Sequence, residues 1–262
     1  MEDEINHKQS LLYSKGKNNQ AILILHGFAV NIKQTDLLFD YFKAKDFTVF
    51  RPIMPGHDGT LEGLKSYGPK DWLETSRAAL NKLSEEVDSI FILGISFGSN
   101  IGLSLCVEGN PKIKAVVIEE MPIFFSFKMA AVLHFVQPIY QLLGIEFISK
   151  NSHLWRKNNI QREESFAYIP VKVTGLIKKY INTKTKKDLA KLKIPIFVIQ
   201  AKKSDLINNN RIAKYICKMV DKSQRKFFCV PINNHDLNVL DDEGKIIVLE
   251  NIYKFIKGIK NV

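Results

Sequence analysis

A serine between two glycines, Gly94-Ile-Ser96-Phe-Gly98, is the part of the sequence best suited to covalent chemistry. It separates an apolar run at residues 90–93 from a helical pattern at 97–108, which predicts a tight strand-to-helix turn. A Cβ at either glycine would collide with the neighbouring strand or helix. Such a turn exposes the Ser96 hydroxyl at the carboxyl edge of a sheet and leaves the Phe97 N–H free at a helix N-terminus. The pattern therefore predicts a nucleophilic serine with one oxyanion donor beside it.

A serine hydroxyl is a weak nucleophile without a base, and His235 is the histidine best placed to serve. It lies in the polar loop Asn233-Asn234-His235-Asp236, between a predicted strand and the last predicted helix. The chain order of serine, acid and then histidine is the order of the α/β-hydrolase triad. We therefore expect His235 to be the general base.

The tripeptide His26-Gly27-Phe28 directly follows the first apolar run, residues 21–25. Gly27 lets the backbone turn so that the Phe28 N–H can point at a reacting carbonyl oxygen, which predicts a second oxyanion donor. His26 is expected to hold this loop through hydrogen bonds and not to transfer protons. His57, in the loop after the second predicted strand, is expected to be structural, with a place lining the site as the alternative.

Short apolar runs alternate with amphipathic segments along most of the chain. The alternation predicts an α/β fold with a mostly parallel sheet covered by helices on both faces. Strands are predicted at 21–25, 47–52, 90–93, 114–118, 195–200 and 226–230, and helices at 33–45, 69–86, 97–108, 208–220 and 242–257.

Residues 121–193 interrupt this alternation, with helical patterns, no clear strand, an aromatic start and a lysine-rich end. We interpret them as a small helical cap inserted over the carboxyl ends of the strands. Residues 1–120 and 194–262 then form the α/β core. Phe124 and Phe125 are the candidate substrate-binding residues, and packing within the cap is the alternative for them.

Composition limits the class of protein. The chain has 262 residues, of which 45% are hydrophobic, so it can bury a full core and is not intrinsically disordered. The net charge of +11 favours anionic partners, but without a recognition motif it predicts no nucleic-acid binding. Neither a P-loop, nor a dinucleotide glycine pattern, nor a zinc spacing is present, so no cofactor or metal is expected.

The predicted location is cytoplasmic. The three cysteines are scattered without the spacing of a disulfide framework, which fits a reducing compartment. The N-terminus is acidic and polar, unlike a signal peptide. The most apolar stretch, residues 121–145, is interrupted by prolines and polar residues, so no stable membrane insertion is expected.

The sequence resembles the carboxylesterase/monoacylglycerol lipase group of bacterial α/β-hydrolases over nearly its whole length. This resemblance implies the α/β-hydrolase fold, a helical cap over an acyl-chain pocket, Ser96 as nucleophile, His235 as base, and the Phe28 and Phe97 amides as the oxyanion hole. The stretches that carry it are Leu23-Ile-Leu-His-Gly-Phe28, Pro52-Ile-Met-Pro-Gly-His57, Tyr67-Gly-Pro-Lys-Asp-Trp72, Gly94-Ile-Ser-Phe-Gly98, and His235 followed by Leu240-Asp-Asp and Asn251-Ile-Tyr-Lys-Phe-Ile256.

The third member of the triad departs from the pattern of that group, in which the acid comes four residues after a strand-end glutamine. Counting from Gln200, that position is Ser204, and Asp205 comes one residue later. A one-residue insertion in the turn would restore Asp205, which is our expected acid. The alternatives are Glu119 or Glu120, at the end of the strand after the nucleophile, or no carboxylate at all.

The expected function is that of a serine esterase acting on a small-molecule ester through an acyl-enzyme on Ser96. Short- to medium-chain acyl esters and monoacylglycerol are the expected substrates. A thioesterase or hydroxycinnamoyl esterase with the same triad is one alternative, and a non-catalytic α/β-hydrolase that binds a ligand is another. The sequence leaves acyl length and oligomeric state open.

Overall fold

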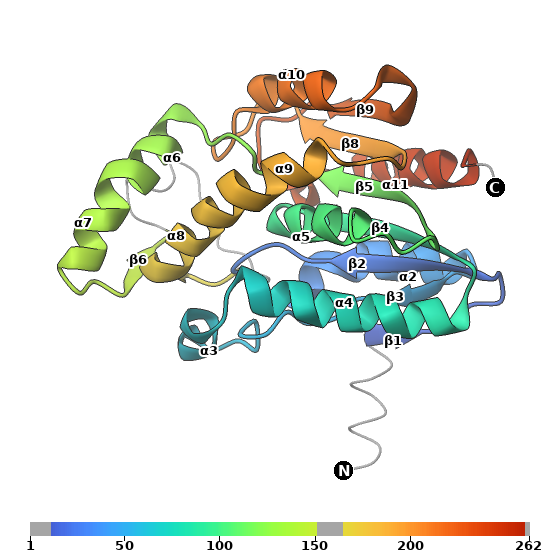
Figure 1. Cartoon of the computed structure of the whole chain (residues 1–262), viewed down its shortest axis with the longest axis horizontal. Helices are drawn as coiled ribbons and strands as arrows, with labels where there is room; N and C mark the ends of the chain where they lie inside the picture. The colour runs from blue at the N-terminus through green and yellow to red at the C-terminus, as the bar shows by residue number, and fades with distance from the viewer. Residues whose placement is uncertain (1–11, 151–164, 260–262) are drawn as a thin grey trace, which may run out of the picture.

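A seven-stranded sheet forms the centre of the molecule in the computed structural model, which describes residues 12–150 and 165–259 (Figure 1). The N-terminal residues considered above lie outside these ranges. The strand order is β1-β3-β2-β4-β5-β8-β9, and every neighbouring pair is parallel except β1 with β3. The mostly parallel sheet predicted from the sequence is confirmed. Its strands are β1 (Tyr13–Ser14), β2 (Gln20–Leu25), β3 (Thr48–Phe50), β4 (Ser89–Ile95), β5 (Ile113–Glu119), β8 (Ile196–Ala201) and β9 (Arg225–Val230).

Helices cover both faces of the sheet, which explains why its central strands are uniformly apolar. In β2, Leu23 packs into one core cluster and its neighbour Ile24 into the cluster on the opposite face. On the Leu23 side lie α4 (Pro69–Glu86), α5 (Phe97–Cys106) and α10 (Asn209–Met219). On the Ile24 side lie α2 (Asp36–Ala44) and α11 (Asp242–Lys257). Shorter helices are η1 (Ile32–Thr35), α3 (Leu61–Ser66), η4 (Lys222–Gln224) and η5 (Leu237–Val239).

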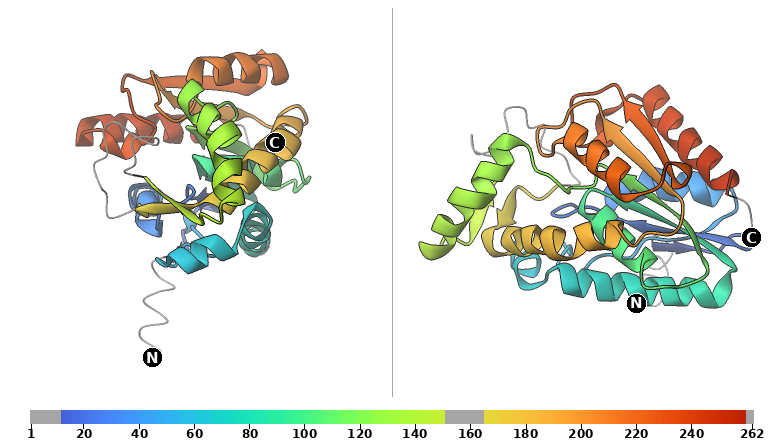
Figure 2. Two further views of the ribbon diagram at one scale, coloured as in Figure 1. Left: turned by 90° about the vertical axis from the view of Figure 1, so that its left-hand side faces the viewer. Right: turned by 45° about the horizontal axis from the view of Figure 1, so that its top comes forward.

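The segment between β5 and β8 extends from one end of the sheet, with α6 and α7 lying farthest from it (Figures 1 and 2). The sequence predicted no clear strand in this segment. That prediction is wrong, because β6 and β7 form an antiparallel pair. Each has three residues, too few for a periodic pattern to be recognised. The elements of this segment are α6 (Phe127–Ala131), the π-helical turn η2 (Val132–Val136), α7 (Gln137–Leu142), β6 (Phe147–Ser149), β7 (Tyr168–Pro170), α8 (Val171–Tyr180), the π-helical turn η3 (Ile181–Thr185) and α9 (Lys186–Leu189).

The helical run α8–η3–α9 leads from this segment back onto the core and packs against α5. The Tyr180 hydroxyl donates to Ser104 Oγ at 2.7 Å, and Ser104 Oγ donates to the Asp188 carboxylate at 2.6 Å. Asn100 Nδ2 donates to Thr185 Oγ1 at 3.1 Å. The end of the inserted segment is thus part of the layer that covers the sheet.

Among the described residues, no helix is long and apolar enough to cross a membrane.

Candidate active site

Ser96 sits at the turn between β4 and α5 in a strained backbone conformation. Its φ of 50° and ψ of −120° are rare for a residue other than glycine and occur where the surrounding structure imposes them. A Cβ at Gly94 would overlap the backbone of Ser99, and a Cβ at Gly98 would overlap the carbonyl of Leu25. Both glycines are therefore required for β4, the turn and α5 to approach this closely.

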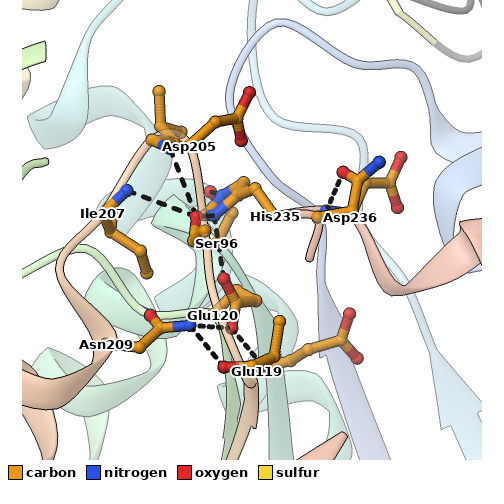
Figure 3. Close-up of polar contacts among 12 residues, drawn as sticks. Ser96, Glu119, Glu120, Asp205, Ile207, Asn209, His235 and Asp236 are labelled. Carbon is orange, nitrogen blue, oxygen red and sulfur yellow. Dashed lines mark hydrogen bonds and ion pairs between the residues drawn. The ribbon is translucent and has the colours of Figure 1, made fainter. Parts of the chain in front are cut away.

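His235 lies beside Ser96, in the loop between β9 and η5. The distance between Ser96 Oγ and His235 Nε2 is 2.9 Å, which is a normal hydrogen-bond length (Figure 3). The next residue, Asp236, caps η5 by accepting the Asn238 N–H at 3.0 Å, which fixes the end of the loop. The structure thus brings together the serine and the histidine that the sequence singled out.

The other ring nitrogen of His235 faces Glu120, which follows the last residue of β5. Glu120 Oε2 lies 3.1 Å from His235 Nδ1 (Figure 3). Its Oε1 accepts the Ala201 N–H at 2.6 Å and Asn209 Nδ2 at 3.1 Å, so both oxygens of this fully buried carboxylate are engaged. With Nδ1–H donating to Glu120, Nε2 is the acceptor that faces the Ser96 hydroxyl.

The expected contact between Asp205 and His235 is wrong, because Glu120 takes that position. Asp205 is exposed, and its carboxylate points away from His235 in Figure 3. Ser204 instead faces the ring, with its Oγ 3.4 Å from Nδ1, and accepts the backbone N–H groups of Leu206 and Ile207, both at 3.3 Å. These bonds hold the turn so that Ser204 faces the site, and the one-residue shift that would bring Asp205 inward does not occur.

Glu119 precedes Glu120 but has a different environment. Its carbonyl accepts the Ser96 N–H at 2.8 Å and the Ser99 hydroxyl at 3.2 Å, which ties β5 to the turn. Its side chain extends away from His235 (Figure 3). Burial, and then the charges of Asp236 and Glu120, raise the pKa of Glu119 to about 8, so this carboxyl is mostly protonated at neutral pH.

The two backbone N–H groups predicted as oxyanion donors belong to segments that lie beside Ser96. Phe97 is the first residue of α5, so no carbonyl within the helix can accept its N–H. Phe28 belongs to the loop after β2, where a Cβ on Gly27 would come within 3.4 Å of Ser96 Cβ, so this loop runs directly beside the serine.

His26 orients the peptide that carries the Phe28 N–H. Its Nε2 accepts the Met54 N–H at 3.0 Å, so Nδ1 carries the proton and donates to the Gly27 carbonyl at 2.8 Å. In a trans peptide the N–H points opposite to the carbonyl, so this bond directs the Phe28 N–H away from His26. Burial lowers the pKa of His26 to about 4 and keeps the ring neutral, which fits the structural role expected for it.

His57 is also buried among these residues. Its Nε2 accepts the Ala29 N–H at 3.2 Å, and its ring packs edge-on against Trp72 at 5.3 Å. Burial lowers the pKa of His57 to about 3, so it remains a neutral acceptor. It lines a cavity of only about 10 Å³ with Phe28 and Phe97, too small for a substrate.

Phe124 and Phe125 pack against other protein groups. The Phe124 ring lies 5.2 Å from the ring of Tyr215, with the Arg211 guanidinium 4.1 Å and Lys186 Nζ 4.9 Å from its centroid. Phe125 forms an isolated β-bridge with Ile207 and packs on the small apolar cluster of α6 and η2. Their role in substrate binding stays a prediction.

The sequence did not indicate two groups at the site, Asn209 and the Ala201 N–H, which both donate to Glu120 Oε1. Asn209 also donates to the Ala201 carbonyl at 2.7 Å, which ties α10 to the end of β8. A single asparagine at the start of a helix looks like a cap residue, and only the fold brings it to the carboxylate. Among the described residues, no group of three His, Cys, Asp or Glu side chains could hold a metal ion.

Comparison with known proteins places this geometry in context. A family model described as serine aminopeptidase, S33, matches residues 16–241. A carboxylesterase of Bacillus subtilis (strain 168) is 24% identical over 244 residues, covering 91% of this chain and 93% of that protein.

Solved structures extend the similarity in three dimensions. One described as the metagenome-derived lipolytic enzymes LipS and LipT has a TM-score of 0.79 at 19% identity, covering 94% of this chain and 96% of that one. The monoacylglycerol lipase of Paleococcus ferrophilus has a TM-score of 0.72 at 13% identity, covering 93% and 96%. At these identities the likeness to the solved structures is one of fold.

Proposed function

The chain belongs to the serine aminopeptidase S33 family of α/β-hydrolases, and on that premise we propose that it hydrolyses carboxylic esters through an acyl-enzyme on Ser96. The observation that carries the proposal is the unbroken contact from Ser96 Oγ to His235 Nε2, 2.9 Å, and from His235 Nδ1 to Glu120 Oε2, 3.1 Å. This arrangement supports the triad roles of nucleophile, base and acid for these residues.

In the first half of the reaction, Ser96 Oγ attacks the ester carbonyl carbon while its proton moves to His235 Nε2. The negative charge that develops on the carbonyl oxygen is stabilised by the N–H groups of Phe28 and Phe97. His235 then gives the proton to the departing alcohol oxygen, and the acyl group stays on Ser96. In the second half, a water molecule attacks the acyl carbon while its proton moves to His235 Nε2. His235 then returns that proton to Ser96 Oγ as the acyl–oxygen bond breaks, which releases the carboxylic acid and restores the free enzyme.

Glu120 assists by holding His235 in one tautomer and by stabilising the imidazolium that forms in both halves of the reaction. Its bonds to Ala201 and Asn209 matter here, because a buried carboxylate needs hydrogen-bond donors in place of the lost water. We do not assign Asp205 to the triad.

The relatives support esters with an apolar acyl group as the substrate class, since a carboxylesterase, lipolytic enzymes and a monoacylglycerol lipase are among them. We propose short- to medium-chain acyl esters or a monoacylglycerol. We also propose a cytoplasmic location, supported by the free thiols of Cys106, Cys217 and Cys229. The division into an α/β core and a cap at 121–193 is part of the same proposal.

The test uses p-nitrophenyl acetate, butyrate, octanoate and palmitate beside a monoacylglycerol, a matched thioester, a hydroxycinnamoyl ester and alanine p-nitroanilide. We expect hydrolysis of the acyl esters and labelling by a fluorophosphonate. Faster turnover of the anilide would contradict an esterase and favour a peptidase. A folded protein that neither hydrolyses any ester nor takes the label would be a binding protein.

Two variants assign the residues. Ser96→Ala should abolish hydrolysis and labelling while the fold is retained, and more than about a thousandth of wild-type kcat would exclude Ser96 as nucleophile. His235→Ala should be nearly as severe. Because the two residues act as a unit, the double variant should be little slower than either single variant.

A further inference from the structure

The loop that carries the Phe28 oxyanion donor is held in an unfavourable conformation at its next residue. Ala29 has a φ of 56°, in the left-handed region that residues with a Cβ rarely adopt. Such a conformation persists only where neighbouring groups over-determine it. The contacts of Ala29 therefore decide where the Phe28 N–H points.

Both polar groups of Ala29 are bonded, on one side by the core and on the other by the inserted segment. The Ala29 N–H donates to His57 in the core, as described above. The Ala29 carbonyl accepts two bonds from the segment between β5 and β8, one from the Phe166 N–H at 3.1 Å and one from Lys150 Nζ at 2.8 Å.

Lys150 follows β6 directly and is itself anchored there. Its backbone N–H donates to the Ala167 carbonyl at 2.8 Å, and its Nζ also donates to Ser165 Oγ at 2.7 Å. Ser165 in turn forms a β-bridge with Val30, the residue after Ala29. The ammonium group is thus fixed on the same short stretch of chain that pairs with the loop.

Packing adds to these bonds. Ala29 is fully buried and lies in an apolar cluster with Ile148 of β6 and Ile169 of β7. The β6–β7 pair therefore covers the oxyanion loop, and Lys150 supplies its charged contact. A hydrogen bond from an ammonium is roughly twice as strong as one between neutral groups, so it contributes strongly to the orientation of the Ala29 carbonyl.

We propose that Lys150 is a positioning residue, which holds the oxyanion loop through the Ala29 carbonyl and so keeps the Phe28 N–H aimed at the reacting oxygen. The inference rests on the proposed esterase function. His26 fixes the peptide before Phe28, and Lys150 fixes the peptide after Ala29, so the donor is held from both sides. The inserted segment then takes part in stabilising the transition state, in addition to covering the site.

The test is Lys150→Met, which keeps the length and apolar body of the side chain and removes the ammonium. Removing an oxyanion donor costs about 10²- to 10³-fold in kcat, and a misaimed donor should cost less, on the order of tenfold, with KM nearly unchanged. Lys150→Arg should restore most of kcat because it retains a charged donor. Ser165→Ala, which removes one partner of Lys150, should cause a smaller loss.

The matched control is Lys178→Met. Lys178 also belongs to the inserted segment and also donates to a backbone carbonyl, that of Leu133 at 3.1 Å, but this contact lies outside the oxyanion loop. Its kcat should equal that of the wild type. Inhibition by an alkyl trifluoromethyl ketone gives a second measurement, because its serine adduct carries an oxyanion. Its Ki should rise in Lys150→Met by the same factor by which kcat falls.

A Lys150→Met protein with unchanged kcat and Ki, or with a raised KM and a lowered melting temperature alone, would overturn the proposal and leave Lys150 a purely structural residue. Amide hydrogen exchange over residues 27–31 tests the clamp without any substrate. Faster exchange in Lys150→Met than in Lys178→Met is expected, and equal exchange contradicts the clamp even if the wild type shows no esterase activity. Wild-type inactivity itself would count against the proposed function.

Discussion

Two regions at the same edge of the sheet carry a carboxylate near His235. They are the end of β5 and the loop after β8, and they differ in how firmly the structure holds the carboxylate. Glu120, at the end of β5, is fully buried and bonded to Ala201, Asn209 and His235. Asp205, in the loop after β8, is exposed. A parallel strand has both its neighbours as supports, whereas a surface turn is positioned by only a few local bonds.

The comparison also shows how two adjacent acids acquire different properties. Glu119 and Glu120 are neighbours, but their side chains leave β5 in different directions (Figure 3). Burial, and then the charges of Asp236 and Glu120, raise the pKa of Glu119 to about 8, while both oxygens of Glu120 are engaged in hydrogen bonds. Hydrogen-bond donors, and not proximity alone, therefore select the carboxylate that faces the histidine.

Among the variants of the carboxylates and of Ser204, the largest effect is expected for Glu120→Gln. A glutamine cannot accept hydrogen bonds on both sides as the carboxylate does, so either His235 Nδ1 or the Ala201 and Asn209 donors lose their partner. The imidazolium also loses its countercharge. We expect kcat to fall by roughly 10³- to 10⁴-fold with little change in KM, measured on the best p-nitrophenyl ester. A loss of kcat below about tenfold would contradict the assignment of Glu120, and not Asp205, as the acid.

A second variant tests whether an aspartate in the loop after β8 can take over the role of Glu120. Ser204 Oγ is already 3.4 Å from His235 Nδ1, so an aspartate there can reach the ring. In the Glu120→Gln background, Ser204→Asp should recover kcat by roughly tenfold or more, because a carboxylate again faces the histidine. Ser204→Asn is the neutral control and should recover nothing. Equal rates for both double variants would mean that the loop cannot position an acid.

Glu119→Gln tests the electrostatic side of the comparison. The pKa of Glu119 is about 8 in the folded protein, against an ordinary value of 4.5. Between these two pH values, the Glu119 carboxyl is protonated in the folded protein and ionised in the unfolded chain. Its contribution to stability is complete below pH 4.5 and is lost as pH rises to about 8. Denaturant unfolding should show Glu119→Gln gaining on the wild type by up to about 4 kcal/mol between pH 4.5 and 8. A pH-independent difference would contradict the raised pKa.

The smallest effect is expected for Asp205→Asn. Because the Asp205 side chain is exposed and points away from His235, we expect kcat to stay within about threefold of the wild type. The assay and substrate are those used for Glu120→Gln, so the two variants can be compared directly. A severe loss of kcat in Asp205→Asn, with a mild loss in Glu120→Gln, would mean that Asp205 and not Glu120 is the acid of the triad.

Much of the fold could be predicted because its signals are local. The apolar runs marked the six parallel strands, and the glycines at 94 and 98 marked the turn that exposes Ser96. The strands β1, β6 and β7 were missed, since two or three residues are too few for a pattern. These short elements owe their conformation to their neighbours, and β6 and β7 are the ones that lie against the loop of Phe28 and Ala29.

The sequence by itself determined the strand-to-helix turn at Ser96 and the loop of Gly27 and Phe28 after the first parallel strand, because each depends on residue types within a few positions of one another. Only the tertiary structure decided which acid meets His235. That choice depends on groups 81 and 89 residues from Glu120, the Ala201 N–H and the Asn209 amide, which stabilise a buried charge. A charge is placed by the donors that surround it in space, and their positions exist only once β5, β8 and α10 have packed together.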